Sequence, residues 1–195
     1  MQASPAFSSG CEVDAVQAMP KQKERFEDVT EVGPEDALAL RGALGRFATG
    51  VTVITTCDDE GHLEGLTANS FGALSLDPPL VLWNLQRTAR SLPRFVAAEY
   101  FMVNVLCETQ ERLARHFATA AINKFEGIPY EAGLGNCPVL PGSLSVIGCK
   151  QVRRVDAGDH VIFIGEVIEF SQSDGRPLIF NSGQYHELAP FRKCD

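Results

Sequence analysis

The stretch from Gly65 to Leu85, GLTANSFGALSLDPPLVLWNL, decides the fold of this chain. Two apolar runs flank Asp77-Pro78-Pro79, which predicts a turn because proline can neither donate to a strand ladder nor continue a helix. The run after the turn is continuously hydrophobic, as in a strand buried on both faces. The run before it has a small, polar centre, Thr67-Ala68-Asn69-Ser70, where a core strand would carry Val or Ile. Such a strand leaves room for a flat ligand against its backbone, although a half-exposed strand of an ordinary barrel would have the same composition.

Length and composition predict one globular domain. The chain has 195 residues, of which 45% are hydrophobic and 22% charged, and this is enough for one sizeable core. The formal net charge of −8 argues against a nucleic-acid partner and against an acidic membrane surface, and no apolar run is long enough to span a bilayer. No secretory signal is visible, and the scattered cysteines form no C-x-x-C pair. We therefore expect reduced thiols, no metal site and a cytoplasmic location.

The beginning of the chain divides into two parts. Residues 1–32 carry no periodic pattern and predict a flexible N-terminal arm, which leaves residues 33–195 as the ordered domain. This domain opens with a helix pattern, since Pro34 at a first helical position is followed by two acids. Apolar residues then recur at helical spacing on one face: Ala37, Leu40, Leu44 and Phe47. The pattern predicts a packing helix that ends at Thr49-Gly50.

Short strand patterns follow this helix, with few helices between them. β-Branched or alternating residues predict strands, and apolar spacing predicts two more helices, the second capped by Thr109. The expected strands are residues 51–56, 65–76, 80–85, 100–106, 144–155, 161–171 and 177–180. The expected helices are residues 92–98 and 109–118, with a long loop over 119–142. Consecutive strands with few helices predict a mainly β fold, an antiparallel barrel with a few covering helices.

Few side chains carry an obvious chemistry. The chain lacks the glycine-rich dinucleotide and phosphate motifs and the usual zinc and serine hydrolase motifs. His160 is distinctive because Gly158-Asp159-His160 lies at a tight strand connection, where a loop histidine can point into a pocket. Arg87, Arg90 and Ser91 lie where a strand leads into a helix, and guanidinium charge and free N–H groups can bind an anion there. Solvated arginines at a helix end would show the same spacing.

A set of short motifs occurs along the chain in a fixed order. They are FATGVTVIT at 47–55, TANSF at 67–71, SLDPPL at 75–80, FMVNVL at 101–106, KF at 124–125, GDH at 158–160, PL at 177–178 and GQY at 183–185. Each motif is weak alone, but the ordered set is specific and covers residues 38–188. In this set the chain resembles the flavin reductase-like family, small NAD(P)H:flavin oxidoreductases that supply reduced flavin to two-component monooxygenases.

The resemblance implies an FMN-binding split barrel of Greek-key type. It further implies a homodimer with the flavin in a groove near the interface, FMN or FAD as cofactor, NADH or NADPH as co-substrate, and a flavin-dependent monooxygenase as partner. His160 would be the catalytic residue, positioning the nicotinamide on the open face of the flavin. The flavin-binding residues carried over are Thr49, Gly50, Val51, Thr67, Ala68, Asn69, Ser70, Ser75, Arg90, Ser91, Lys124, Phe125 and Tyr185.

The resemblance also gives these residues separate roles. Arg90 and Ser91 would hold the flavin phosphate, Lys124-Phe125 would close over the far side of the ligand, and the small polar strand would line the ring edge. Two other functions stay open: a flavin-dependent reductase of a corrinoid or ferric complex, and a non-catalytic flavin-binding module. His160 favours the enzyme, since a flavin carrier gains nothing from a nicotinamide site.

Overall fold

The computed structural model describes residues 32–189, so the predicted N-terminal arm lies outside the described residues except for Val32. The chain divides into two units, Met1–Leu40 and Arg41–Asp195. In the first unit a short 3-10 turn, η1 (Pro34–Asp36), leads into helix α1 (Ala37–Leu44), which continues into the second unit. The Gly33 N–H donates to the Asp36 carboxylate over 2.9 Å and caps this turn.

Helix α1 confirms the predicted helix but not its packing face. It ends at Leu44, and Thr49-Gly50 forms the short strand β1 (Thr49–Gly50) instead of ending the helix. No residue of α1 is buried, and Leu44 and Phe47 are 67% and 79% exposed. The residues that follow α1 are held at Gly45, whose carbonyl accepts a hydrogen bond from the Ser182 N–H over 2.8 Å. The apolar spacing therefore predicts the helix correctly, but no described residue of the second unit covers Leu44 or Phe47.

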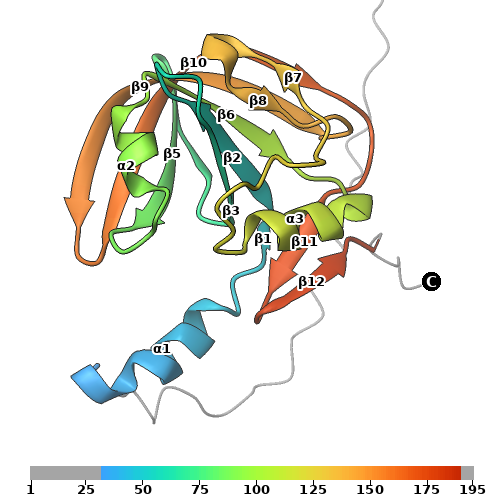
Figure 1. The fold of residues 1–195 in the computed structure, drawn as a ribbon. Helices are drawn as coiled ribbons and strands as arrows, with labels where there is room; N and C mark the ends of the chain where they lie inside the picture. Colours follow the sequence, from blue (N-terminus) through green and yellow to red (C-terminus); the bar gives the residue numbers. More distant parts are fainter. Residues whose placement is uncertain (1–31, 190–195) are drawn as a thin grey trace, which may run out of the picture. The chain divides into compact units, whose positions relative to one another are not determined.

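A seven-stranded sheet carries most of the second unit (Figure 1). Its strands, in the order β3-β2-β6-β9-β10-β5-β4, pair antiparallel throughout. The bounds are β2 (Thr52–Cys57), β3 (Leu63–Ala68), β4 (Gly72–Leu76), β5 (Pro79–Gln86), β6 (Tyr100–Val105), β9 (Ser145–Ala157) and β10 (His160–Gln172). The mainly β, antiparallel prediction is confirmed. The ladders leave β3 and β4 as the two edges of the sheet, so its closure into a split barrel stays a prediction.

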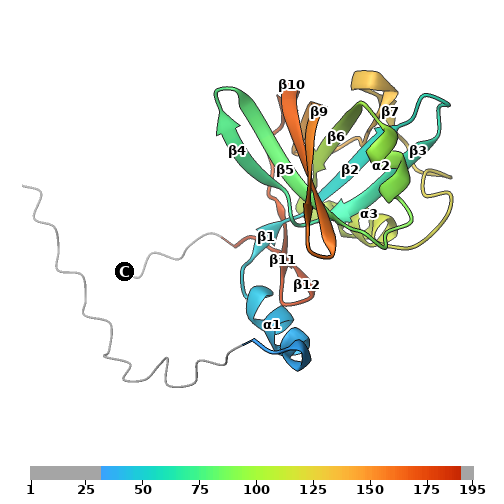
Figure 2. The same ribbon diagram turned by 90° about the vertical axis from the view of Figure 1, so that its left-hand side faces the viewer.

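The strand predicted over residues 65–76 is wrong, because the chain forms two strands there. β3 ends at Ala68, which pairs with Thr52 of β2, whereas β4 begins at Gly72, which pairs with Leu82 of β5. Residues 69–71 therefore connect opposite edges of one sheet. The predicted turn at Asp77-Pro78 is confirmed, since it joins β4 and β5 as a hairpin. β9 and β10 form the long hairpin that Figure 2 shows, close to the two strands predicted for this part of the chain.

Smaller elements complete the second unit. They are β7 (Glu131–Ala132), β8 (Pro138–Val139), β11 (Leu178–Asn181), β12 (Gln184–Glu187), α2 (Leu92–Ala97), α3 (Glu111–Phe117) and the 3-10 turns η2 (Glu108–Gln110) and η3 (Leu134–Asn136). β1, β11 and β12 form a three-stranded sheet, although no strand is predicted at β12. Thr109 is not the cap of α3, because Gln110 occupies the position before this helix. The turn η2, which precedes α3, is closed by a hydrogen bond from the Cys107 N–H to the Gln110 side chain, over 3.0 Å. No helix within residues 32–189 is long and apolar enough to cross a membrane.

Two apolar clusters stabilise this arrangement. In the first, Trp83 of the opening stretch stacks on Phe163 at 4.5 Å and meets Phe95 and Phe101 edge-on at 5.0 and 5.9 Å. This geometry is favourable for aromatic rings. The second cluster joins β2, α3, β11 and the loop after α3: Val51, Val53, Leu106, Ala114, Phe117, Phe125, Leu140 and Leu178. The two clusters fix the strand ends from which the candidate site is built.

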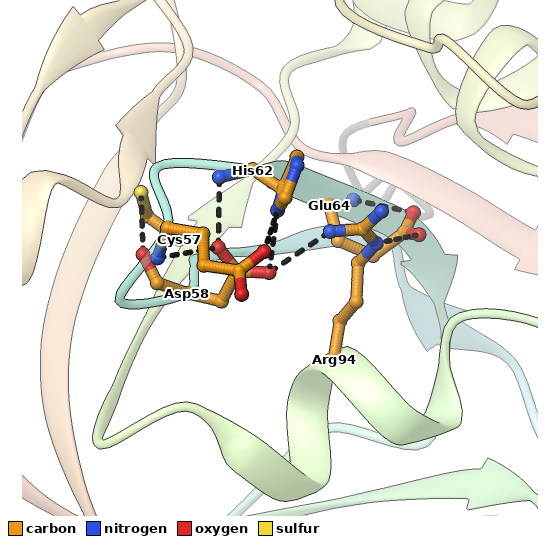
Figure 3. A network of polar contacts seen from close by, with 7 residues as sticks. Cys57, Asp58, His62, Glu64 and Arg94 are labelled. Carbon is orange, nitrogen blue, oxygen red and sulfur yellow. Dashed lines mark hydrogen bonds and ion pairs between the residues drawn. The ribbon is translucent and has the colours of Figure 1, made fainter.

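A polar network ties the β2–β3 turn to α2 (Figure 3). Asp58 accepts hydrogen bonds from the backbone N–H of His62 over 2.8 Å and from Arg94 over 2.9 Å. Glu64 lies 4.0 Å from the Arg94 Nε. Burial opposes ionisation of Asp58, but the hydrogen bonds from His62 outweigh it and lower the pKa of this carboxyl. Asp58 thus closes the β2–β3 hairpin and, through Arg94, also holds α2.

Candidate functional site

A pocket of about 170 Å³ lies between β3, the end of α3 and the β11–β12 hairpin. Its lining residues are Val51, Thr67, Asn69, Ala118, Phe180 and Tyr185. Four of them, Val51, Thr67, Asn69 and Tyr185, are residues that the resemblance assigns to flavin. The structure therefore brings together residues that lie far apart in the sequence. Sequence reasoning missed Ala118 and Phe180, whose apolar side chains carry no signal of a site.

Strand alternation decides which residues of the small polar strand face the pocket. Thr67 and Asn69 line it, whereas Ala68 between them is 7% exposed and belongs to the first apolar cluster. The Ala68 carbonyl is also used, since it accepts a hydrogen bond from Thr52 Oγ1 over 2.7 Å. The side chain of Ala68 is thus a core residue, and a contact of its backbone with the ring edge stays a prediction.

The hydroxyl groups expected at the ring edge are largely used inside the protein. Thr67 Oγ1 donates to the Ala114 carbonyl over 2.6 Å and so attaches β3 to α3. Ser70 Oγ donates to the Asn84 carbonyl over 3.3 Å and accepts from the Asn84 N–H over 3.0 Å. By contrast, Thr49 Oγ1 is buried and has no hydrogen-bond partner among residues 32–189. Thr49 therefore offers a buried hydroxyl to a ligand.

Tyr185 and Phe180 form an aromatic wall of the pocket. Their rings meet edge-on at 5.3 Å, and the Arg115 guanidinium lies 4.9 Å from the centre of the Tyr185 ring. Burial raises the pKa of Tyr185, the Arg115 charge opposes this, and Glu111 adds to the rise. The phenol is therefore neutral at physiological pH and offers a ring face and an O–H. Arg115 had no sequence signal, because only the fold places α3 against β12.

Lys124 and Phe125 are buried beside the pocket wall and are not among its lining residues. Lys124 Nζ donates to the Gly65 carbonyl over 2.8 Å and to the Phe117 carbonyl over 3.1 Å. Burial lowers the pKa of Lys124, and Glu64 opposes this effect. The Phe125 ring packs edge-on against Phe117 at 5.2 Å. This pair holds β3 to the end of α3, and its expected closure over the ligand stays a prediction.

His160 begins β10, where it pairs with Gln86 of β5. Its Nδ1 lies 2.7 Å from the Asp159 carboxylate, and 43% of its side chain is exposed. Arg87 fixes this turn, because its N–H donates to the Asp159 carbonyl over 2.8 Å and its Nη2 pairs with Asp156 at 2.8 Å. With Nδ1 bonded to Asp159, Nε2 is the ring atom left for a ligand.

The other expected residues lie outside the pocket lining. Arg90 is exposed and Ser91 is buried in the turn that leads from β5 into α2, at the same end of β5 as His160. Ser75 lies on β4 opposite Leu80, and Gly50 is an exposed residue of β1. The expected residues thus form two main groups, one at the pocket and one at the end of β5 and β10.

Comparisons with known proteins identify the family. Residues 44–189 match the family model described as "Flavin reductase like domain". The chain is 40% identical over 159 residues to the FMN reductase (NADH) SmoA of Agrobacterium fabrum, covering 82% of this chain and 90% of that protein. It is 43% identical over 157 residues to the flavin-dependent monooxygenase reductase subunit HsaB of Rhodococcus jostii, covering 80% of each chain.

Solved structures agree with these sequence relatives. The NADH:FAD oxidoreductase SgcE6 of Streptomyces globisporus superposes with a TM-score of 0.78 at 36% identity, covering 84% of this chain and 99% of that chain. The chain therefore belongs to the flavin reductase-like family.

Proposed function

We propose that the chain is an NAD(P)H-dependent flavin reductase that supplies reduced FMN or FAD to a partner monooxygenase. The single observation that carries this function is the pocket in which Thr67 and Asn69 of the small polar strand meet Tyr185. Relatives named as an NADH-dependent FMN reductase and as a monooxygenase reductase subunit support it. The bound flavin supplies the chemistry, accepting a hydride from the reduced nicotinamide, and the protein supplies binding and orientation.

The residues of the pocket fit a flavin ring. Val51 and Phe180 offer apolar contacts, and Asn69 offers a polar side chain. Two residues before Val51, and outside the pocket lining, the buried Thr49 Oγ1 lacks a partner among the described residues. An unpartnered buried hydroxyl is costly unless a ligand satisfies it. The Thr49 hydroxyl would hold a polar atom of the flavin, and the pocket walls would exclude water from one side of the ring.

The size of the pocket supports a homodimer. Its volume of about 170 Å³ is below the roughly 300–1,000 Å³ of sites that enclose a drug-sized ligand. Leu44 and Phe47 of the same unit leave large apolar side chains exposed, which is typical of a surface that a second chain covers. A second copy would complete the flavin groove, and sedimentation of the active enzyme at micromolar concentration tests this state.

His160 would position the nicotinamide against the flavin. Asp159 holds the imidazole by a hydrogen bond to Nδ1, and Arg87 holds the turn that carries both residues. The ring is therefore oriented before the dinucleotide binds, and Nε2 is free to hydrogen-bond its carboxamide. This assigns His160 a role in orientation rather than in proton transfer.

Arg90 would hold the flavin phosphate together with Ser91. Because the lost interaction is a hydrogen bond to a charged group, Arg90→Ala should weaken FMN binding by about 1.5–3 kcal/mol. Riboflavin lacks the phosphate and is the matched ligand, so its affinity should stay nearly unchanged. Titrating both flavins by fluorescence quenching makes the comparison. Equal losses for both would place the phosphate elsewhere.

The function is tested by following NADH absorbance with and without added free flavin. A reductase should oxidise NADH rapidly only when FMN or FAD is present, and under anaerobic conditions reduced flavin should appear in solution. A flavin-binding module would bind flavin without oxidising NADH. A reductase of a corrinoid or ferric complex would need that acceptor for turnover. Either result would contradict the proposed function.

A further inference from the structure

The Asn84 side chain is an unexplained buried polar group beside the site. Its Oδ1 is buried and has no hydrogen-bond partner within the part of the chain that the structure describes. Buried amide oxygens are nearly always paired in native proteins, and exceptions point to a missing water, ion or ligand. Asn84 is not among the site residues that the resemblance assigns, because its position in an apolar strand run gives no functional signal.

Strand register places Asn84 next to both groups of site residues. Asn84 lies opposite Ile162, and Gln86 lies opposite His160, so Asn84 and His160 are diagonal neighbours on one face of the β5–β10 pair. Diagonal neighbours in such a pair lie about 7–8 Å apart, within reach of one ligand. On its other edge, the backbone of Asn84 is bonded to Ser70, the residue after the pocket residue Asn69. The amide therefore lies between the pocket and His160.

The two hydrogen bonds between Ser70 Oγ and the Asn84 backbone fix that backbone and do not use the side-chain amide. Strand alternation turns this amide away from Trp83 and Leu85, which are buried in the first apolar cluster. The hydroxyls of Thr67 and Ser70 are already bonded inside the protein. The Asn84 Oδ1 is thus a hydrogen-bond acceptor that is held in place and has no partner among the described residues.

We propose that Asn84 binds the imide edge of the flavin ring, with Oδ1 accepting a hydrogen bond from the ring N3–H. The inference rests on the proposed function. An oxidised flavin ring has one N–H donor, N3–H, and carbonyl oxygens flank it. A carboxamide presents an acceptor beside a donor and so matches this edge, as asparagine matches the edge of adenine in nucleic acids.

Riboflavin and 3-methylriboflavin test this contact, because the methyl group replaces the N3 hydrogen alone. Their affinities are measured by fluorescence quenching without NADH, so the readout is independent of turnover. The wild-type protein should bind riboflavin roughly tenfold more tightly than the methylated analogue, the scale of one hydrogen bond with a buried partner. Asn84→Leu keeps the approximate size of the side chain and should bind both flavins equally weakly.

Gln86→Leu is the matched control, since Gln86 lies two residues along the same strand on the same face and is exposed. It should keep the full preference for riboflavin.

The comparison of the two flavins on the wild-type protein needs no substitution, so it decides the question even if Asn84→Leu does not fold. Equal wild-type affinities, or a preference that survives in Asn84→Leu, would overturn the role of Asn84. If the wild-type protein reduces riboflavin with NADH in either case, the proposed function stands and only this inference fails. A wild-type protein that binds neither riboflavin nor FMN would overturn both.

Discussion

Replacing His160 with alanine should lower kcat/KM for NADH by roughly 10–100-fold, because a misplaced nicotinamide loses both a contact and its reacting geometry. The structure holds the imidazole at the start of β10 through Asp159, at 2.7 Å, and leaves Nε2 for a ligand. Flavin affinity should change little, since the proposed contact of His160 is with the nicotinamide and not with the flavin. Stopped-flow reduction of bound flavin at several NADH concentrations separates the two effects.

His62 provides a matched control for this experiment. It also lies beside a strand turn, its Nδ1 lies 3.1 Å from Asp58, and its side chain is similarly exposed at 51%. His62→Ala should therefore leave the NADH dependence unchanged. An equal loss in both variants, or no loss in His160→Ala, would mean that His160 is only part of its turn.

Asp159→Asn should have a smaller effect in the same direction, because it loosens the imidazole without removing it. The hydrogen bond from His160 lowers the pKa of Asp159. A carboxyl with a lowered pKa stays ionised at neutral pH, and its pairing is lost only as the pH falls through that lowered value. The pair between Asp159 and His160 is therefore complete at neutral pH and weakens on the acid side.

Local sequence patterns predict the strands and helices of this fold much better than they predict which elements pair or pack with one another. The proline turn, the Trp83 strand and the β9–β10 hairpin follow from residue types that are close in sequence. The break between β3 and β4 does not, because it depends on which distant strand each half pairs with. Helix α1 shows the same limit: spacing predicts its apolar face, but spacing carries no information about what covers that face.

The candidate site shows this difference at the level of single side chains. The family motifs predict Thr67, Asn69 and Tyr185 at the site, and the fold brings these residues to one pocket. The motifs cannot say that the Thr67 hydroxyl is taken by Ala114, which is 47 residues away. A motif fixes which residue is present, whereas its hydrogen-bond partner comes from elements that only the folded chain brings close.

Lys124→Met should lower the free energy of unfolding by about 2 kcal/mol and leave the flavin affinity of the folded protein unchanged. The change removes the ammonium that the Gly65 and Phe117 carbonyls share, at 2.8 and 3.1 Å, and leaves both oxygens without this donor. Burial of the Lys124 charge is unfavourable and lowers the pKa of this residue. Removing the charge therefore offsets part of the cost. The melting temperature should fall by roughly 4–8 °C.

Lys150→Met separates this role from a general effect of lost charge. Lys150 pairs with Glu99 at 3.2 Å on the surface, with 48% of its side chain exposed, so its loss should leave the urea midpoint nearly unchanged. Lys124 would be a ligand-binding residue after all if Lys124→Met unfolded at the wild-type urea concentration but bound FMN and riboflavin more weakly. The structure favours the opposite result, because both hydrogen bonds of the ammonium go to backbone carbonyls of β3 and the end of α3, and Lys124 is not among the pocket-lining residues.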